Sequence, residues 1–268
     1  MKLSIIIVNY KTAPLTKALI ESLLPQEIVG GCEIIVVDNN SMDDSVALLR
    51  SDFPEITVID NEANVGLAAG VNKGIAAAKG QYYLILNPDM IALPGSIKTL
   101  VEYMDKHAEV GMAGGKLKSP NGKLQYSCYR FYTPMTIVRR RTWLGKLPKG
   151  RADIRRFLMK DYDHVAPREV EWLMGACLIT RASVVKKVGG MDEQFFLYFE
   201  DVDWCRRVWE AGFKVSYVPA AEFSHFHQRS SEGGSFLSIL TNRPTREHIK
   251  SAFKYFWKFR GKSLPQVA

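Results

Sequence analysis

The sequence predicts an α/β fold built on a Rossmann-like, mostly parallel sheet with helices on both faces. Two observations lead to this prediction. Short, almost wholly apolar runs alternate with longer helix-like stretches through the first ninety residues, and the composition of the 268-residue chain, 47% hydrophobic and 24% charged, is ordinary for a globular protein. Strands that are buried on both faces appear as continuous apolar runs, and right-handed crossovers between them build a doubly wound sheet.

The expected elements follow one another in a regular order. The strands are Leu3–Val8, Glu33–Val37, Ile56–Ile59 and Tyr82–Leu86, and the helices lie near residues 14–24, 43–51, 66–78 and 95–106. A strand order of 3-2-1-4 makes the first and fourth strands neighbours and places the switch point of the sheet between them. A later helix is expected to begin at Glu200, after an aromatic run.

Polar residues follow each expected strand. They are Asn9-Tyr10-Lys11, Asp38-Asn39-Asn40-Ser41, Asp60-Asn61 and Asn87-Pro88-Asp89. Open α/β sheets bind their ligands outside the carboxyl ends of the strands, so we expect Asn9 and Asp89 to face the same ligand. A carboxylate in this position suits a divalent cation that also binds substrate phosphates, although Asn-Pro-Asp is equally typical of a turn.

The glycines near the third expected helix do not form a known nucleotide fingerprint. There is neither a Gly-x-Gly-x-x-Gly motif nor a P-loop. Gly70 and Gly74 share a helix face with Gly66, and for these two we favour close packing of the helix on the sheet. Gly66 stands at the helix entrance, where its N–H either meets a diphosphate or serves only the local turn.

Three acidic residues, Glu200, Asp201 and Asp203, follow an aromatic run that ends at Phe199. An ion pair from Asp203 to Arg207, four residues on, explains Asp203 alone. Packing carboxylates against aromatic residues raises their pKa toward the range of a general base. Downstream, His225 and His227 are either metal ligands or the polar face of a strand.

The net charge of +8 is concentrated in two segments. Residues 139–168 carry ten Lys or Arg against three Asp, and residues 246–262 carry six against one Glu. The aromatic and basic run from Phe253 to Arg260 suits an interfacial helix on anionic lipid, and equally a basic face packed on its aromatic side. Nucleic-acid binding is a third interpretation, but no recognisable binding motif is present, so we expect no nucleic-acid partner.

The chain shows no sign of a membrane span or a secretory leader. No apolar run approaches the roughly 18 residues that a span requires, and the run at Leu3–Val8 is followed by polar residues without a cleavage site. None of the cysteines forms a Cys-x-x-Cys pair, so we expect neither a zinc knuckle nor a disulfide framework. The cysteines are Cys32, Cys128, Cys177 and Cys205. We therefore expect a mature, cytoplasmic protein.

Together these motifs resemble the inverting nucleotide-sugar glycosyltransferases of family 2, which have the GT-A fold, and above all their bacterial rhamnosyltransferase branch. The matching stretches occur in the family's order between residues 4 and 231. They are Ser4–Tyr10, Val36–Ser41, Asn64–Gly74, Leu86–Asp89, Trp172–Ala176, Val188–Glu193 and Glu200–Trp204. Each stretch is short, but together they are specific for the family and much less so for the sugar.

The resemblance implies which residues bind the donor and a divalent metal, Mg²⁺ or Mn²⁺. The donor-binding residues are Val8, Asn9, Tyr10, Asp38, Asn64, Gly66, Asn87 and Asp89. Asn87-Pro88-Asp89 stands in the place of the family's Asp-x-Asp motif, with Asp89 on the metal and Asn87 replacing the first acid. His225 matches a metal-ligating histidine, but the glycine that follows it in the family is Gln228 or Arg229 here.

The resemblance also implies the catalytic and acceptor residues. Asp201 matches the family's catalytic base, and the acceptor side comprises Trp172, Gly175 and Glu200. In this scheme residues 1–110 bind the donor, residues 111–232 hold the acceptor and the catalytic groups, and residues 233–268 form a basic, aromatic helix. The basic segment 139–168, with Gly145 and Gly150, is a candidate for a loop that closes over the donor.

The implied activity is inverting transfer of a sugar, with L-rhamnose from dTDP-L-rhamnose as the expected donor. The expected acceptor is a hydroxyl of a glycan, free or linked to a polyprenyl diphosphate, in cell-surface polysaccharide synthesis. A UDP-sugar donor such as UDP-N-acetylglucosamine is one alternative, and a sugar-nucleotide-binding protein without turnover is another. The basic segments lead us to expect peripheral contact with the anionic inner face of the cell membrane.

Overall fold

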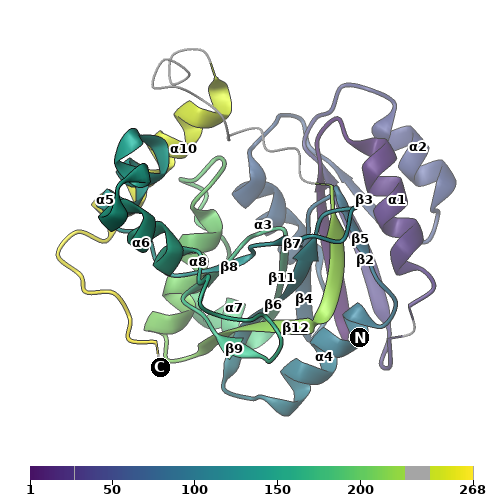
Figure 1. Ribbon diagram of the computed structural model, residues 1–268. Coiled ribbons are helices and arrows are strands. Elements are labelled where there is room, and N and C mark those ends of the chain that lie inside the picture. The colour runs from purple at the N-terminus through teal and green to yellow at the C-terminus, as the bar shows by residue number, and fades with distance from the viewer. Residues whose placement is uncertain (27, 227–241, 268) are drawn as a thin grey trace.

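The computed structural model describes residues 1–26, 28–226 and 242–267. It confirms the α/β class: one large sheet lies at the centre and helices cover both of its faces (Figure 1). The main path of the sheet has the strand order β3-β2-β1-β4-β11-β6-β12-β5, with β7 added to β6 and β9 to β12. The predicted order 3-2-1-4 of the first four strands is therefore correct.

The first half of the chain forms the parallel part of the sheet. Its strands are β1 (Leu3–Asn9), β2 (Cys32–Asp38), β3 (Thr57–Asp60) and β4 (Tyr82–Leu86), all paired in parallel. The helices between and after them are α1 (Ala13–Leu23), α2 (Ser45–Asp52), α3 (Leu67–Ala77) and α4 (Ser96–Lys106). All four expected strands and all four expected helices are present, within a few residues of their predicted bounds.

The second half extends the same sheet with mixed pairing. Its strands in this sheet are β5 (Met90–Ala92), β6 (Val110–Lys118), β7 (Leu124–Gln125), β9 (Arg168–Glu169), β11 (Cys177–Arg181) and β12 (Lys214–His225). The strands β8 (Cys128–Tyr129) and β10 (Trp172–Leu173) form a separate, two-stranded antiparallel sheet. β11 lies antiparallel between β4 and β6, and β12 runs parallel to β6 and antiparallel to β5. Because β11 pairs with β4, the sheet runs on without a break across the expected boundary at residue 110, and the division into three parts stays a prediction.

The remaining helices lie on the second half and at the end of the chain. They are α5 (Pro134–Arg141), the 3₁₀ turn η1 (Trp143–Lys146), α6 (Pro148–Phe157), α7 (Ala182–Val188), α8 (Glu200–Glu210) and α10 (Arg243–Lys258). The basic segment expected to be a loop is thus largely helical. Gly145 and Gly150 lie where a Cβ would collide with a neighbouring backbone carbonyl, so both serve close packing there.

The hydrophobic core has one part on each face of the sheet. Leu19 of α1 and Ile97 of α4 pack on one face, whereas Ala68 of α3 and Val202 of α8 pack on the other. A Cβ at Gly74 of α3 would lie 2.4 Å from Cγ2 of Ile6, which confirms the expected close packing of this helix on the sheet. Almost wholly apolar strands such as β1 are needed because both faces are covered.

Two further expectations concern cysteines and membrane spans. All four cysteines are free thiols, as expected, and three of them are buried. Within the described residues, no helix has the length and apolar character needed to cross a bilayer.

Candidate active site

The carboxyl ends of the strands and the start of α8 meet at one edge of the sheet. The register pairs Asn9 with Asp38, and β1 lies beside β4. Directly after β4, the N–H of Asn87 donates to the carbonyl of Ala176 at 3.0 Å. The neighbouring N–H of Gly175 donates to Oδ2 of Asp201 at 2.9 Å. A short path of contacts therefore joins the expected metal loop to the expected base.

A cavity of about 320 Å³ opens at this edge beside β1. Four of the expected donor-binding residues line it: Val8, Tyr10, Asn64 and Gly66. The other lining residues are Asn39, Leu67, Phe196, Leu197, Arg243, Pro244 and Glu247. Tyr10 is partly exposed and Val8 is buried, so the cavity offers an aromatic ring and an apolar floor to a flat heterocycle.

Asn9 and Asp38 are buried beneath this cavity and hydrogen-bonded to the protein itself. Nδ2 of Asn9 donates to Oδ1 of Asp38 at 2.6 Å, and Oδ1 of Asn9 accepts from the hydroxyls of Thr12 and Thr16. Asp38 also accepts two bonds from Ser41. Asn9 therefore holds Asp38 in position, and contact of either residue with a nucleoside stays a prediction.

Two N–H groups at the entrance of α3 are bonded within the protein. Oδ1 of Asn64 accepts from the N–H of Gly66 at 3.0 Å, and the N–H of Leu67 donates to the carbonyl of Phe196 at 2.9 Å. A Cβ at Gly66, where φ is +86°, would lie 2.5 Å from the Phe196 carbonyl oxygen. Gly66 thus serves the turn and the approach of the 196 segment, and its contact with a diphosphate stays a prediction.

Asp89 and His225 face one another, as the sequence predicted. Asp89 lies in the turn between β4 and β5, and β5 pairs with β12, so that Met90 lies opposite His225. Nε2 of the buried His225 lies 3.4 Å from Oδ1 of Asp89. On its other side, Nδ1 of His225 lies 2.8 Å from Oε1 of Gln125, whose amide also donates to the His225 carbonyl.

Asp89 and His225 together could supply two ligands to a divalent cation. Because the Gln125 oxygen can only accept, Nδ1 of His225 donates to it, and Nε2 is the nitrogen that faces Asp89. Among the residues that the structure describes, no three His, Cys, Asp or Glu side chains gather around one point. One carboxylate and one imidazole still suit a divalent cation whose other ligands are substrate phosphates and water. His227 lies outside the described residues.

Asp201 is held by the backbone at the start of α8. Its Oδ2 accepts from the Gly175 N–H and its Oδ1 accepts from the Val202 N–H at 2.8 Å. Burial raises the pKa of Asp201 to about 6, against the lowering effect of these two hydrogen bonds. Such a carboxylate is ionised at neutral pH, yet basic enough to take a proton from a hydroxyl.

Comparison with known proteins identifies the family. The model of the family described as "Glycosyl transferase family 2" matches residues 4–189. The chain belongs to glycosyl transferase family 2. The matched residues include β1 to β4, the Asn87-Pro88-Asp89 loop and the Gly175 turn, but they end before Asp201 and His225. The positions of Asp201 and His225 are therefore known from the fold and not from the family match.

Two curated relatives match more of the chain. An N-acetylglucosaminyl-diphospho-decaprenol L-rhamnosyltransferase of Mycobacterium tuberculosis is 28% identical over 243 residues, which are 82% of this chain and 73% of the relative. Rhamnosyltransferase WbbL of Escherichia coli K12 is 27% identical over 269 residues, 96% of this chain and 93% of the relative.

Solved structures support the GT-A-like fold of this family 2 glycosyltransferase. S. aureus TarS 1-349 in complex with UDP has a TM-score of 0.60 at 17% identity, over 86% of this chain and 62% of TarS 1-349. GalNAc-T7 with UDP, GalNAc and Mn²⁺ has a TM-score of 0.60 at 15% identity, over 84% of this chain and 44% of that one. The chain thus spans less than two thirds of either crystallised protein.

The other acidic residues of this glycosyltransferase differ sharply from Asp201. Glu200 is buried, and both its burial and the adjacent Asp201 raise its pKa well above the usual range. Asp203 is fully buried and forms ion pairs with Arg207 at 2.7 Å and with Lys258 of α10 at 2.5 Å. The predicted Asp203–Arg207 pair is confirmed, but it is buried, and Lys258 was not foreseen.

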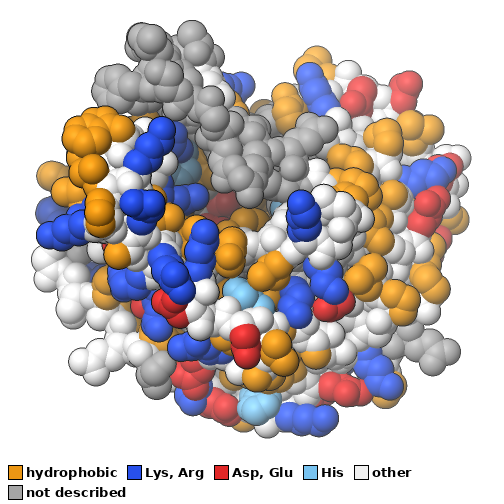
Figure 2. Space-filling view, viewed as in Figure 1, with side chains coloured by type: hydrophobic (Ala, Val, Ile, Leu, Met, Phe, Trp, Pro, Cys, Tyr) orange, Lys and Arg blue, Asp and Glu red, His pale blue; other side chains and the backbone are white. Residues whose placement is uncertain are grey.

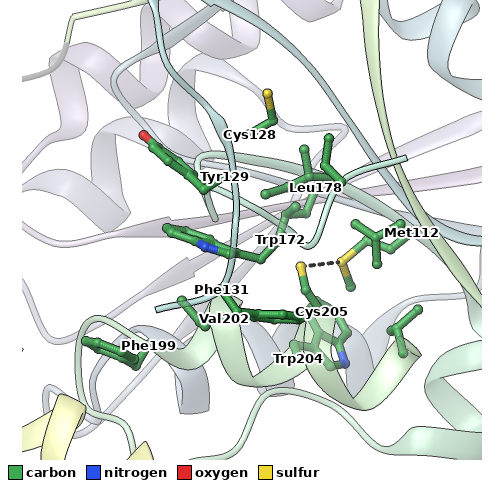
Figure 3. Packing of buried hydrophobic residues seen from close by; sticks show 14 of the residues in the cluster. Met112, Cys128, Tyr129, Phe131, Trp172, Leu178, Phe199, Val202, Trp204 and Cys205 are labelled. Carbon is green, nitrogen blue, oxygen red and sulfur yellow. Dashed lines mark hydrogen bonds between the residues drawn. The ribbon is translucent and has the colours of Figure 1, made fainter. Parts of the chain in front are cut away.

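Trp172, expected on the acceptor side, lies within the aromatic core. Its ring stacks on Tyr129 with centroids 4.4 Å apart, and its indole N–H donates to the Arg130 carbonyl at 2.8 Å. Figure 3 shows Trp172 beside Tyr129 and above the α8 residues Val202 and Trp204. Contact of Trp172, Gly175 or Glu200 with an acceptor stays a prediction.

Several residues at the site were not singled out from the sequence. Gln125 orients His225, Asn39 lines the cavity, and Arg243, Pro244 and Glu247 bring the start of α10 to the same cavity. Asn39 lies in Val36–Ser41, one of the stretches that resemble the family, so it could have been named from the sequence. Gln125 lies 100 residues from His225, and no periodicity or motif marks it or the start of α10.

Proposed function

We propose that this chain is a metal-dependent, inverting rhamnosyltransferase. It transfers L-rhamnose from dTDP-L-rhamnose to a hydroxyl of a lipid-diphosphate-linked glycan in cell-surface polysaccharide synthesis. The names of both curated relatives support the rhamnosyl donor, and the name of the mycobacterial relative supports an acceptor sugar on a polyprenyl diphosphate.

One observation carries the reaction type. The Asp89–His225 pair and the Asp201 carboxylate are linked through Asn87, Ala176 and Gly175, all at the carboxyl edge of the sheet. A cation site and a base with a raised pKa, beside a cavity of nucleoside size, are the parts that a direct displacement at an anomeric carbon needs.

The chain's own residues have separable tasks in this reaction. The cavity beside Tyr10 receives the nucleoside, and Asp89 and His225 hold the cation. Asp201 takes the proton of the acceptor hydroxyl as its oxygen attacks the anomeric carbon and the bond from that carbon to the diphosphate oxygen breaks. When bound, the cation supplies positive charge against the charge that develops on the leaving diphosphate. Attack from the side opposite the leaving group inverts the anomeric centre.

Association with a membrane surface is part of the proposed function. The inner side of α10 packs on the protein through Tyr255 and Ala252, whereas Phe253 and Trp257 are 69% and 59% exposed. Arg260 lies over the Trp257 ring, with its guanidinium carbon 4.1 Å from the ring centroid. Exposed aromatic side chains beside a basic residue suit the interface of an anionic bilayer. The helix is thus packed on one side and exposed on the other, and its exposed side supports the proposed membrane contact.

A UDP-sugar is the second candidate donor, because TarS was also crystallised with UDP-GlcNAc. A donor panel decides between them. The purified protein is incubated with Mg²⁺ or Mn²⁺, a lipid-diphosphate-linked N-acetylglucosamine and one nucleoside-diphosphate sugar at a time. Release of nucleoside diphosphate is then measured. We expect release with dTDP-L-rhamnose. Release only with a UDP-sugar would contradict the rhamnosyl donor, and donor binding without any release would mean a binding protein.

A further inference from the structure

Two adjacent arginines of α5, Arg140 and Arg141, have no acidic partner among the residues that the structure describes. Arg139 pairs with Asp153 at 3.2 Å. Arg140 instead donates to the Tyr132 hydroxyl at 2.7 Å and lies over the Phe157 ring, 4.9 Å from its centroid. Arg141 makes no hydrogen bond and no ion pair within the described part of the chain, although it is half-buried. Two guanidinium groups side by side, with no carboxylate to balance them, favour a bound anion.

His248 of α10 lies close to Tyr132, whose hydroxyl accepts from Arg140: the two ring centroids are 6.4 Å apart. Its ring centroid lies 5.2 Å from that of Phe199 and 5.4 Å from that of Tyr198. Its Nδ1 is buried and has no hydrogen-bond partner among the described residues. Burial and the charges of Arg141 and Arg140 lower the pKa of His248 to about 3, so the ring is neutral at pH 7 and has one N–H to donate.

The three basic side chains lie next to the catalytic base and apart from the cation pair. Tyr132, which binds Arg140, packs against Phe199 with ring centroids 5.0 Å apart, and Phe199 precedes Glu200 and Asp201 in the chain. The cluster is built from α5, α10 and the turn before α8, whereas Asp89 lies in the turn before β5 and His225 at the end of β12. An anion bound here therefore lies on the Asp201 side of the site.

Apolar side chains are exposed around these arginines. Val138 of α5 and Trp143 of η1 flank the pair along the chain, and Trp143 is 68% exposed. In Figure 2, Lys and Arg side chains gather with hydrophobic ones on the left of the molecule, where Figure 1 places α5 and α6. A ligand that joins a compact anion to an apolar chain matches this surface better than a free anion does.

We propose that Arg140, Arg141 and His248 bind the diphosphate of a prenyl-diphosphate-linked acceptor. Arginine recognises phosphate oxygens through paired N–H groups, and the neutral imidazole adds one donor. The sugar attached to that diphosphate then extends toward Asp201, and the prenyl chain leaves along the exposed side chains of α5 and η1. This inference rests on the proposed function and names the feature by which its acceptor is recognised.

Binding of farnesyl diphosphate, with farnesol as its uncharged counterpart, tests this site directly. In the double variant R140Q/R141Q, we expect affinity for farnesyl diphosphate to fall on the order of tenfold or more, the usual loss for hydrogen bonds to a charged group. Affinity for farnesol should fall much less. The matched control is R151Q/R156Q, which removes the same charge from exposed positions of α6 and should bind both ligands as the unaltered protein does.

Two further measurements separate the possible sources of the anion. Affinity for dTDP in the presence of Mg²⁺ is measured for the same proteins, and an equal loss for dTDP would show that the arginines hold the donor's diphosphate instead. If R140Q/R141Q and the control R151Q/R156Q lose affinity for farnesyl diphosphate equally, binding is due to general attraction by positive charge and not to a specific site. If the double variant does not fold, the same affinities are measured for Arg141→Gln alone. Arg141 makes no hydrogen bond within the described part of the chain, so this change removes no internal contact of that kind. Turnover of the unaltered protein, measured in parallel, tests the proposed function separately.

Discussion

At the scale of single residues, the backbone around Asp201 determines what this carboxylate can do. The residues before it, Tyr198 and Phe199, both have positive φ, at 67° and 70°. Non-glycine residues in this region are held there by the surrounding structure and are frequent at active sites. Here the strained turn directs the start of α8 toward the Gly175 N–H, which then fixes Asp201.

The rate should depend on pH through Asp201. The base works only when it is ionised, and its pKa is raised to about 6. We therefore expect kcat/KM to rise with pH through about 6 and to level off above it, with about a tenfold fall per unit below. The profile is measured with a donor whose diphosphate does not titrate in that range. A rising limb near 4, the usual value for an exposed Asp, would contradict the environment described here.

Gln125 should control the metal affinity of His225. In Gln125→Leu the proton on Nδ1 loses its acceptor, so the ring is free to turn or to change tautomer. Loss of such a supporting hydrogen bond typically weakens metal binding 10–100-fold, and we expect a weakening of about that size for Mn²⁺ in the presence of dTDP. Gln125→Glu, which keeps an acceptor at this position, is the matched control. Equal Mn²⁺ affinity in all three proteins would remove His225 from the metal site.

Sequence reasoning named the candidate residues of this site better than their partners. Asp89, His225 and Asp201 were named from motif order, and the structure brings Asp89 and His225 to 3.4 Å, while their roles stay predictions. Contact of Asn9 with the donor also stays a prediction, and only the folded chain shows that both ends of its amide are used internally. A motif gives residue types and spacing, but it does not show which hydrogen bonds are already taken.

At the scale of secondary-structure elements, α8 and α10 are joined by a buried group of charges. Asp203 of α8 lies between Arg207 and Lys258, and Lys258 also pairs with Asp192 at 2.6 Å. Lys258 is therefore half-buried, with its ammonium group held by two carboxylates. The sequence could not indicate this contact, since 55 residues separate Asp203 from Lys258.

Asp203→Asn should destabilise the protein strongly. The change leaves two cations near a neutral amide in a buried position, and breaking a buried pair in this way costs about 3–5 kcal/mol. Asp52→Asn, which breaks an exposed pair with Lys17, should cost about 0–1 kcal/mol. Free energies of unfolding from denaturant titration give both numbers. Similar costs for the two variants would mean that the charges around Asp203 contribute no more than a surface pair.

At the scale of the whole molecule, the helices at one end of the sheet present the surface proposed to meet a membrane. α10 lies on the far side of the molecule from α1 and α2 (Figure 1). The alternation of apolar runs and helices was enough to predict the nucleotide half and its strand order. The mixed half was not predictable in detail, because strands as short as β8 and β10, of two residues each, carry no periodic signal.

Vesicle binding should depend on the exposed aromatic residues of α10. In the double variant F253S/W257S, we expect binding to vesicles of anionic phospholipid to weaken at least tenfold, since each buried aromatic side chain contributes about 1.5–3 kcal/mol. Leu24→Ser combined with Leu48→Ser removes exposed apolar side chains from α1 and α2 and should leave binding unchanged. Equal binding by all three proteins would show that α10 is not the membrane contact.

The most direct test of the proposed reaction is the turnover of Asp201→Asn. This variant keeps the shape and most hydrogen bonds of the carboxylate but accepts no proton. With saturating donor and acceptor, we expect nucleoside diphosphate release to fall about 10²–10⁴-fold, the usual contribution of a general base, with donor affinity nearly unchanged. Near-normal turnover by Asp201→Asn would contradict the account, because no other described carboxylate is held by Gly175 beside the cation pair.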